Sequence, residues 1–177
     1  HSAHVASVVL ASPAGIETFS PAQRRVLEVT VTPDFVRKQL HGQIRDSLAL
    51  AFYRMPPEAQ WLIDRRTRMV GAELEGYAHA FAAGVRAMLA NPVRRRLAEV
   101  QQSSVILMGD HDRLVPNRVF HPGQSPEQLM SAAAPDLGAE VMMFQRTGHL
   151  LPFERPGRFA GEVLAFTSPI SVVQPSP

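Results

Sequence analysis

The sequence predicts an α/β fold with about three parallel strands, flanking helices and an inserted helical segment. Three short apolar runs, at residues 5–10, 105–108 and 140–144, are typical of strands buried on both faces. Helical patterns fill the long segments between them, as parallel strands require, because such strands are joined by crossovers of a dozen or more residues. The chain of 177 residues is long enough to bury a core and would usually form one domain.

The composition is that of a globular protein, with 45% hydrophobic and 19% charged residues. The absence of cysteine excludes disulfides and thiolate metal sites and leaves the compartment open, with the cytoplasm favoured. The net charge is only +2, and acids are interspersed among the arginines, so we expect no nucleic-acid partner. No apolar run approaches the ~18 residues of a membrane span.

The first strand ends in a turn at residues 12–15, and the helical insertion follows. Two helix starts carry a Ser or Thr N-cap followed by proline, at Ser20-Pro21 and Thr32-Pro33. Leu40, Ile44 and Leu48 have helical spacing in a helix that ends at Pro56-Pro57. More helix is expected between Glu58 and about Leu89, and a short helix from Asn91-Pro92 to about Glu99.

The second and third strands are each followed by a helical segment. Ser125-Pro126 predicts a helix to about Ala134, and residues 135–138 predict the turn into the third strand. A last helix begins near Arg155. It places Phe159, Val163 and Phe166 on one face. The tail, residues 168–177, is rich in proline and serine and is expected to be disordered.

Two titratable side chains follow the second and third strands. Asp112 comes after the run that ends at Gly109, and His149 comes after Thr147-Gly148. Open α/β sheets place their chemistry at the carboxyl ends of parallel strands. An acid and a histidine there are two members of a hydrolytic triad, with Asp112 as the candidate acid and His149 as the candidate base.

Metal binding and phosphate binding are weaker interpretations of the polar residues. Oxygen and imidazole ligands from the Asp and His residues could suit zinc or manganese, but their spacing matches no common metal motif, so we expect neither metal nor cofactor. Two arginine clusters could contact phosphates, although acids nearby favour solvated helix faces. The metal candidates are Asp110, His111, Asp112, His121 and His149, and the arginine clusters are Arg65, Arg66, Arg68 and Arg94–Arg96.

The segment Gly109-Asp110-His111-Asp112-Arg113-Leu114-Val115-Pro116, together with Gly148-His149, resembles the carboxyl-terminal half of a capped α/β-hydrolase of the esterase, lipase or C–C hydrolase kind. In that family a G-x-x-D-x-x-x-P stretch after the seventh strand supplies the triad acid, and a G-H after the eighth supplies the base. The resemblance implies these roles for Asp112 and His149. Residues 1–10 and Glu154-Arg155-Pro156 also fit the family pattern.

The resemblance implies a division of the chain. Residues 1–19 and 100–167 would form a partial hydrolase core with strands six to eight, and residues 20–99 would form a helical cap. The family's G-x-S-x-G nucleophile elbow is missing. Gly123–Glu127 lacks the second glycine, Ser125 has a helix-capping role, and Ser2 lies too close to the first strand.

We therefore expect a chain that begins after the elbow and is inactive alone, with a missing amino-terminal half or self-association. The complete enzyme would hydrolyse an ester or similar carbonyl of a small, fairly apolar substrate through a Ser-His-Asp triad. An Asp nucleophile, as in epoxide hydrolases and haloalkane dehalogenases, stays open. The alternative is a catalytically incompetent fragment or relic hydrolase that acts as a binding module. Apolar cap residues that could line a cavity are Phe52, Met55, Trp61, Met69, Tyr77 and Phe81.

Overall fold

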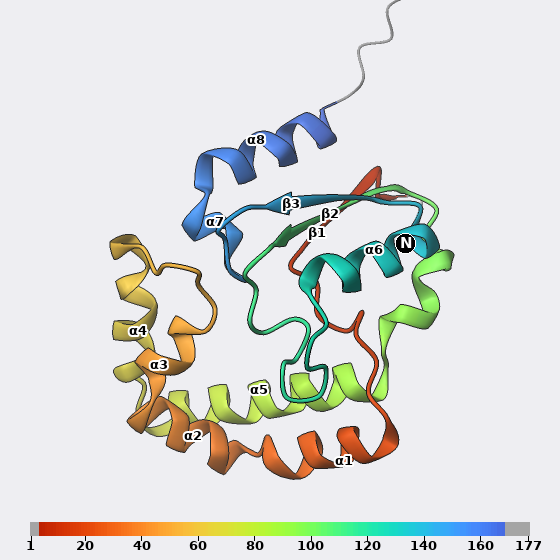
Figure 1. Ribbon diagram of the computed structural model, residues 1–177. Helices are drawn as coiled ribbons and strands as arrows, with labels where there is room; N and C mark the ends of the chain where they lie inside the picture. Colours follow the sequence, from red (N-terminus) through yellow and green to blue (C-terminus); the bar gives the residue numbers. More distant parts are fainter. Residues whose placement is uncertain (1–3, 169–177) are drawn as a thin grey trace, which may run out of the picture.

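The computed structural model describes residues 4–168 and contains a three-stranded parallel sheet in the order β1-β2-β3 (Figure 1). The strands are β1 (Ser7–Ala11), β2 (Ser103–Gly109) and β3 (Glu140–Phe144). In the register, Val9 pairs with Val105 and Val105 with Glu140. The predicted α/β fold with three parallel strands is confirmed. Of the predicted disordered tail, Ser168 ends the last helix, and residues 169–177 lie outside the described residues.

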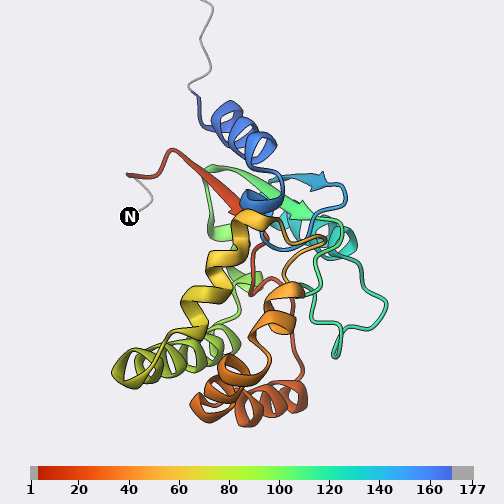
Figure 2. The same cartoon turned by 90° about the vertical axis from the view of Figure 1, so that its left-hand side faces the viewer.

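Helices fill the segment between β1 and β2. They form a layer on one side of the sheet, on the side opposite α8 (Figures 1 and 2). The predicted starts at Ser20 and Thr32 are confirmed, because each side chain accepts a hydrogen bond from the first turn of its helix. The elements are α1 (Pro21–Thr30), α2 (Pro33–Gly42), α3 (Ile44–Ala49), the 3-10 turn η2 (Pro57–Ala59), α4 (Gln60–Thr67), α5 (Gly71–Ala90) and the 3-10 helix η3 (Val93–Glu99).

One of the predicted helices was wrong in length. The helix expected to reach Pro56 breaks at Gln43, after the weak helix former Gly42, and ends at Ala49. The helical stretch expected over residues 58–89 consists of two helices, α4 and α5, and α5 begins at Gly71, which has a left-handed backbone with φ 55°. The chain from residue 50 to residue 56 is thereby free to run against the carboxyl ends of β2 and β3.

The remaining helices cover both faces of the sheet. They are α6 (Pro126–Leu137), α7 (Leu151–Glu154) and α8 (Pro156–Thr167). The predicted turn at residues 135–138 is instead the last turn of α6, which ends at Gly138 with φ 63°. Ser125 starts α6 with a complete capping box, as predicted.

Side chains of β2 alternate between two cores. Ile106 and Met108 pack with Met130 and Ala133 of α6 on one face of the sheet. Val105 and Leu107 pack with Phe144 and Leu151 on the other face, where Phe159, Val163 and Phe166 of α8 join them. The predicted apolar face of the last helix is confirmed, and both faces of β2 are buried.

Candidate active site

Asp112 lies in the loop that follows β2, with its side chain completely buried. Its Oδ1 accepts hydrogen bonds from the backbone N–H groups of Leu114 at 2.7 Å and Val115 at 3.0 Å. A buried carboxylate is costly unless its oxygens have such partners. The loop therefore fixes the orientation of the carboxylate and leaves Oδ2 for another donor.

That donor is the imidazole of His149. Its Nδ1 lies 2.7 Å from Asp112 Oδ2, and its side chain keeps 24% of its surface exposed. Because a carboxylate only accepts hydrogen bonds, Nδ1 bears the proton in the neutral ring, and Nε2 has the free lone pair. The backbone N–H of His149 donates to the carbonyl oxygen of Ala51 at 2.8 Å. The structure thus brings together the two residues that the sequence selected.

Two glycines permit close packing of the main chain around His149. A Cβ on Gly109 would collide with the carbonyl oxygens of Thr147 and Gly148. A Cβ on Gly148 would lie 2.6 Å from the backbone nitrogen of Tyr53 and 2.7 Å from the carbonyl oxygen of Ala51. The main chain beside the histidine leaves no space for a side chain.

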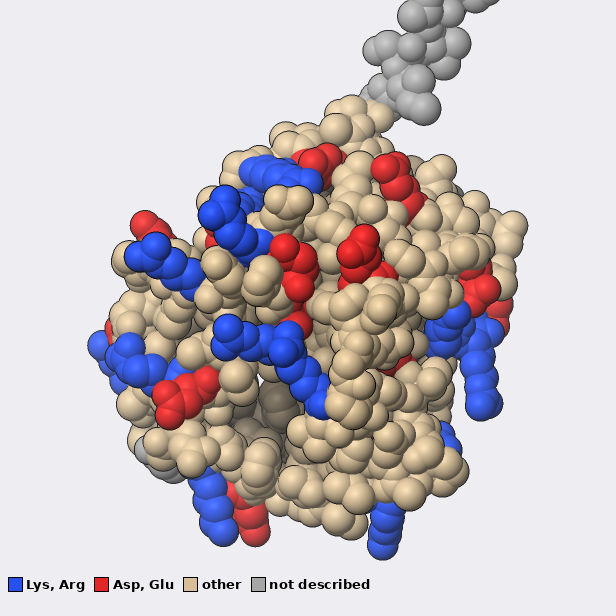
Figure 3. Space-filling model, in the orientation of Figure 1, with Lys and Arg blue, Asp and Glu red and all other residues tan. Residues whose placement is uncertain are grey.

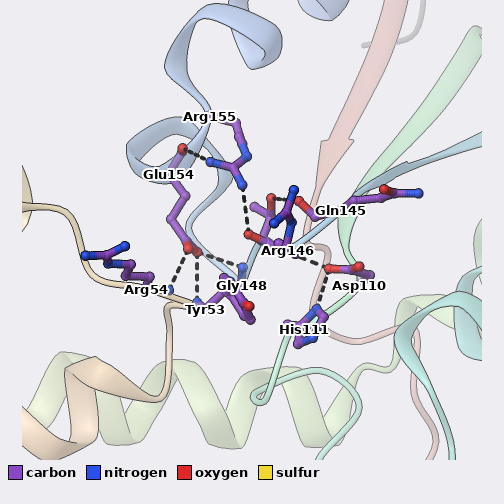
Figure 4. Close-up of polar contacts among 10 residues, drawn as sticks. Tyr53, Arg54, Asp110, His111, Gln145, Arg146, Gly148, Glu154 and Arg155 are labelled. Carbon is purple, nitrogen blue, oxygen red and sulfur yellow. Dashed lines mark hydrogen bonds and ion pairs between the residues drawn. The ribbon is translucent and has the colours of Figure 1, made fainter.

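Glu154, at the end of α7, joins the histidine loop to the segment after α3 (Figure 4). Its Oε1 accepts hydrogen bonds from the backbone N–H groups of Gly148 at 2.7 Å and Tyr53 at 3.1 Å. Its Oε2 accepts from the backbone N–H of Arg54 at 2.9 Å. One carboxylate therefore links two segments that are about a hundred residues apart in the sequence.

Asp110 and His111 form a separate pair beside the site (Figure 4). His111 Nδ1 lies 2.6 Å from Asp110 Oδ1, which also accepts from the backbone N–H of Thr147 at 3.2 Å. Burial alone would raise the pKa of Asp110, but the hydrogen bonds from His111 and from the backbone of Arg146 and Thr147 outweigh it, so the pKa lies below its ordinary value.

Glu17 is a buried carboxylate near Asp112 that the sequence did not indicate. Its Oε2 accepts from the backbone N–H of Asn117 at 2.7 Å and lies 3.6 Å from Nε2 of His121. Burial raises the pKa of Glu17, the hydrogen bond from Asn117 lowers it, and the negative charge of Asp112 raises it further, with a net increase. A glutamate in the loop after the first strand has no distinctive sequence pattern, and only the fold brings it to Asp112.

The fold of the chain is similar to the folds of several solved hydrolases. The chain is similar to a probable hydrolytic enzyme from Pseudomonas aeruginosa PAO1, with a TM-score of 0.74 and 22% identity over 94% of this chain and 57% of that protein. It is similar to an esterase from Exiguobacterium antarcticum, with a TM-score of 0.65 and 15% identity over 92% of this chain and 57% of that protein. It is also similar to MGS-M2, an α/β-hydrolase from a Medee basin deep-sea metagenome library, with a TM-score of 0.56 and 16% identity over 95% of this chain and 58% of that protein.

The chain has the fold of part of an α/β-hydrolase. It spans little more than half of the length of the proteins that it matches. No protein-family model matches the sequence, and no curated protein matches it significantly. The predicted family resemblance is therefore confirmed at the level of the fold.

In this hydrolase fold, a cavity of about 400 Å³ lies among the helices of residues 20–99 and opens beside the acid loop. Ala51, whose carbonyl oxygen binds the His149 backbone, lines it together with Leu114 of the Asp112 loop. Of the apolar residues predicted to line a cavity, Tyr77 and Phe81 do so. The other four do not line it: Phe52 and Met69 are buried in apolar clusters, and Trp61 packs on Phe153. Met55 packs against the cluster of Phe52 and lines a second cavity.

The other residues considered from the sequence are not brought to this pair. Among residues 4–168, no three His, Asp or Glu side chains are grouped so that they could hold a metal ion. No helix in this part of the chain is long and apolar enough to cross a membrane. Several arginines of the two clusters pair with acids on helix surfaces, namely Arg65 with Glu73, Arg94 with Asp136 and Arg96 with Glu99.

Proposed function

We propose that this chain is the carboxyl-terminal part of a hydrolase that cleaves an ester or similar carbonyl compound, with His149 as general base and Asp112 as its orienting partner. The observation that supports this most is the 2.7 Å contact between His149 Nδ1 and the buried Oδ2 of Asp112. In triad chemistry the base takes the proton of the nucleophile through Nε2, while the acid fixes the tautomer and stabilises the imidazolium that forms.

The environment of Asp112 suits an orienting carboxylate rather than a nucleophile. Both oxygens already accept hydrogen bonds, from Leu114 and Val115 on one side and from His149 on the other. Its side chain has no exposed surface through which a substrate could approach. His149, in contrast, keeps a solvent-accessible edge, as a base that meets substrate must.

The cavity supports a small, fairly apolar substrate. We propose that residues 20–99 act as a cap over a core formed by residues 1–19 and 100–167. The cavity walls are mainly aliphatic and aromatic, and a volume of about 400 Å³ lies within the range of small-molecule sites. A cap of this kind would exclude water from the reacting carbonyl.

In this proposal the nucleophile lies outside these 177 residues, because they contain no G-x-S-x-G motif. Ser12 ends β1 at the same edge of the sheet, with φ 43°, but it is only 5% exposed. Its burial argues against attack on a substrate. The chain alone is thus expected to lack triad catalysis. The second candidate function is that of an incompetent relic that binds an apolar ligand in the cavity.

Activated-ester kinetics test the first expectation. The isolated chain mixed with p-nitrophenyl butyrate should release p-nitrophenol without a burst, and the His149→Ala variant should give the same slow rate. A burst that disappears in His149→Ala would mean that the chain does contain a nucleophile.

The roles of the pair are tested by expressing the chain with the coding sequence upstream of His1. A G-x-S-x-G in that sequence would support the hydrolase, and a start codon in its place would support the relic. In the longer protein, Asp112→Asn should lower kcat by about 10³–10⁴-fold. Asp110→Asn is the matched control, since Asp110 bonds His111 and not His149, and it should keep most of the activity. Equal effects of the two substitutions would refute the assignment.

A further inference from the structure

A second cavity, of about 510 Å³, lies at the junction between the segment after α3 and the loop that holds His149. Its lining includes the side chains of Arg54, Arg146 and Arg155, together with Tyr53, Glu154 and Pro56. Neither Asp112 nor His149 lines it, so it is separate from the proposed catalytic pair.

The cavity is strongly basic. Three arginines line it together with one carboxylate, that of Glu154, and this carboxylate already accepts three backbone N–H bonds. In Figure 4, Arg146 and Arg155 lie on one side of Glu154 and Arg54 lies on the other. Figure 3 shows basic side chains, with acidic ones among them, on the surface around α7.

These guanidinium groups lack acidic partners within residues 4–168. Arg155 donates only to carbonyl oxygens, of Glu154 and Arg146 at 3.2 Å each, and no ion pair involves Arg54 or Arg146. Five other arginines in the described part of the chain do pair with carboxylates: Arg37, Arg65, Arg94, Arg96 and Arg158. Within residues 4–168, Glu154 is therefore the one carboxylate that lines the basic cavity, and no acid forms an ion pair with its three arginines.

The cavity wall is held by hydrogen bonds and includes a strained residue. The backbone of Arg146 has φ 49°, in the left-handed region that glycine and asparagine occupy more readily than arginine. Arg155 Nη2 binds the Arg146 carbonyl oxygen, and Glu154 holds Tyr53 and Arg54 in place. Strained positions that the surroundings maintain are concentrated at functional sites.

We infer that this cavity binds a small molecule with a phosphate or carboxylate group. Guanidinium groups present planar, paired donors that match such oxyanions, and they hold their positive charge at any physiological pH. A cavity of about 510 Å³ has room for a small organic anion. This binding activity is independent of hydrolysis and would persist in a chain with no nucleophile.

Calorimetric titration of the 177-residue chain with inorganic phosphate and with citrate, at constant ionic strength, tests the inference. At least one anion should bind saturably, and the one preferred identifies the oxyanion class. The double variant Arg54→Gln/Arg146→Gln should weaken that binding about tenfold, and Arg54→Gln alone about threefold. The single variant leaves the strained residue Arg146 unchanged, so weaker binding by this variant does not result from a folding defect at that position.

Arg86→Gln is the matched control. Arg86 is exposed on α5 and has no ion pair among the described residues, so its loss removes the same charge without touching the cavity. It should change the affinity by less than about twofold. Equal weakening by the control and by Arg54→Gln, or the absence of saturable binding by both anions, would overturn the inference.

Discussion

Gly148 sits where the main chain of the segment after α3 crosses directly in front of the histidine loop. The atoms nearest to a Cβ at this position are backbone atoms of Ala51, Phe52 and Tyr53, at 2.6–2.7 Å. Backbone atoms cannot rotate away as a flexible side chain can, so any side chain must displace the loop that holds His149.

Gly148→Ala should therefore lower the free energy of unfolding by about 2–3 kcal/mol, measured by urea denaturation. Gly84→Ala is the matched control. Gly84 lies within α5 with open space around its Cβ position, and alanine there should stabilise the protein by about 0.5–1 kcal/mol through helix propensity. A Gly148→Ala variant as stable as the native chain would show that the loop can move.

Ionisation of the buried Glu17 makes the stability of the folded chain depend on pH. Its pKa in the folded state lies above the ordinary value, chiefly because of burial. Between the unfolded and folded pKa values the folded state binds more protons than the unfolded state, so stability falls as pH rises through this window. Glu17→Gln removes the ionisation, and its carbonyl oxygen can still accept the bond from Asn117.

The prediction is that native stability relative to Glu17→Gln decreases as the pH is raised from about 4 to about 7. Urea unfolding of both proteins at several pH values measures this difference. Glu127→Gln, on the exposed surface of α6, should show no comparable trend against the native chain. A native chain that gains stability over Glu17→Gln with rising pH would mean that partners of the carboxylate outweigh its burial.

At the scale of helices and strands, local sequence patterns predicted the helix starts that are fixed by interactions between neighbouring residues. The N-caps at Ser20, Thr32 and Ser125 were predicted correctly, because the hydrogen bonds of each cap lie within four consecutive residues. The break after Gly42 was missed, since the apolar spacing of Leu40, Ile44 and Leu48 continues across it. Residues 50–54 are not helical and bind the loop of His149 and the side chain of Glu154. These contacts join segments far apart in the sequence, so the periodicity of apolar residues does not predict them.

Glu154 is the main link between that segment and α7. Glu154→Ala would leave the backbone N–H groups of Tyr53, Arg54 and Gly148 without their acceptor, at a cost of about 1 kcal/mol or more each. Amide hydrogen exchange should quicken about tenfold at these three positions.

The control is Glu127→Ala, which removes a carboxylate from α6 that bonds no distant segment. It should leave exchange at the three amides unchanged. If Glu154→Ala also leaves exchange unchanged there, the segment is held by the Ala51 carbonyl bonds to His149 and Leu150 instead.

For the molecule as a whole, sequence motifs were sufficient to select Asp112 and His149, which contact each other in the structure. They were insufficient to predict the residues around this pair. Asp112 and His149 follow recognisable glycine-containing turns, so each could be selected from a few neighbouring residues. Glu17, Glu154 and Arg146 acquire their positions from loops that meet only in the folded chain. Residues that support a site from distant segments have no short pattern of their own.

The sheet has two outer strands, β1 and β3, and neither has a second partner within residues 4–168. The unpaired N–H and C=O groups of such strands are templates for pairing with another chain. The side chains of β1 are only half-buried, so its outer side adds apolar surface to the same edge. We therefore predict that the isolated chain self-associates. Light scattering after size exclusion should give a mass above 19.5 kDa that rises with concentration, whereas a monomer that melts cooperatively at all concentrations would contradict the prediction.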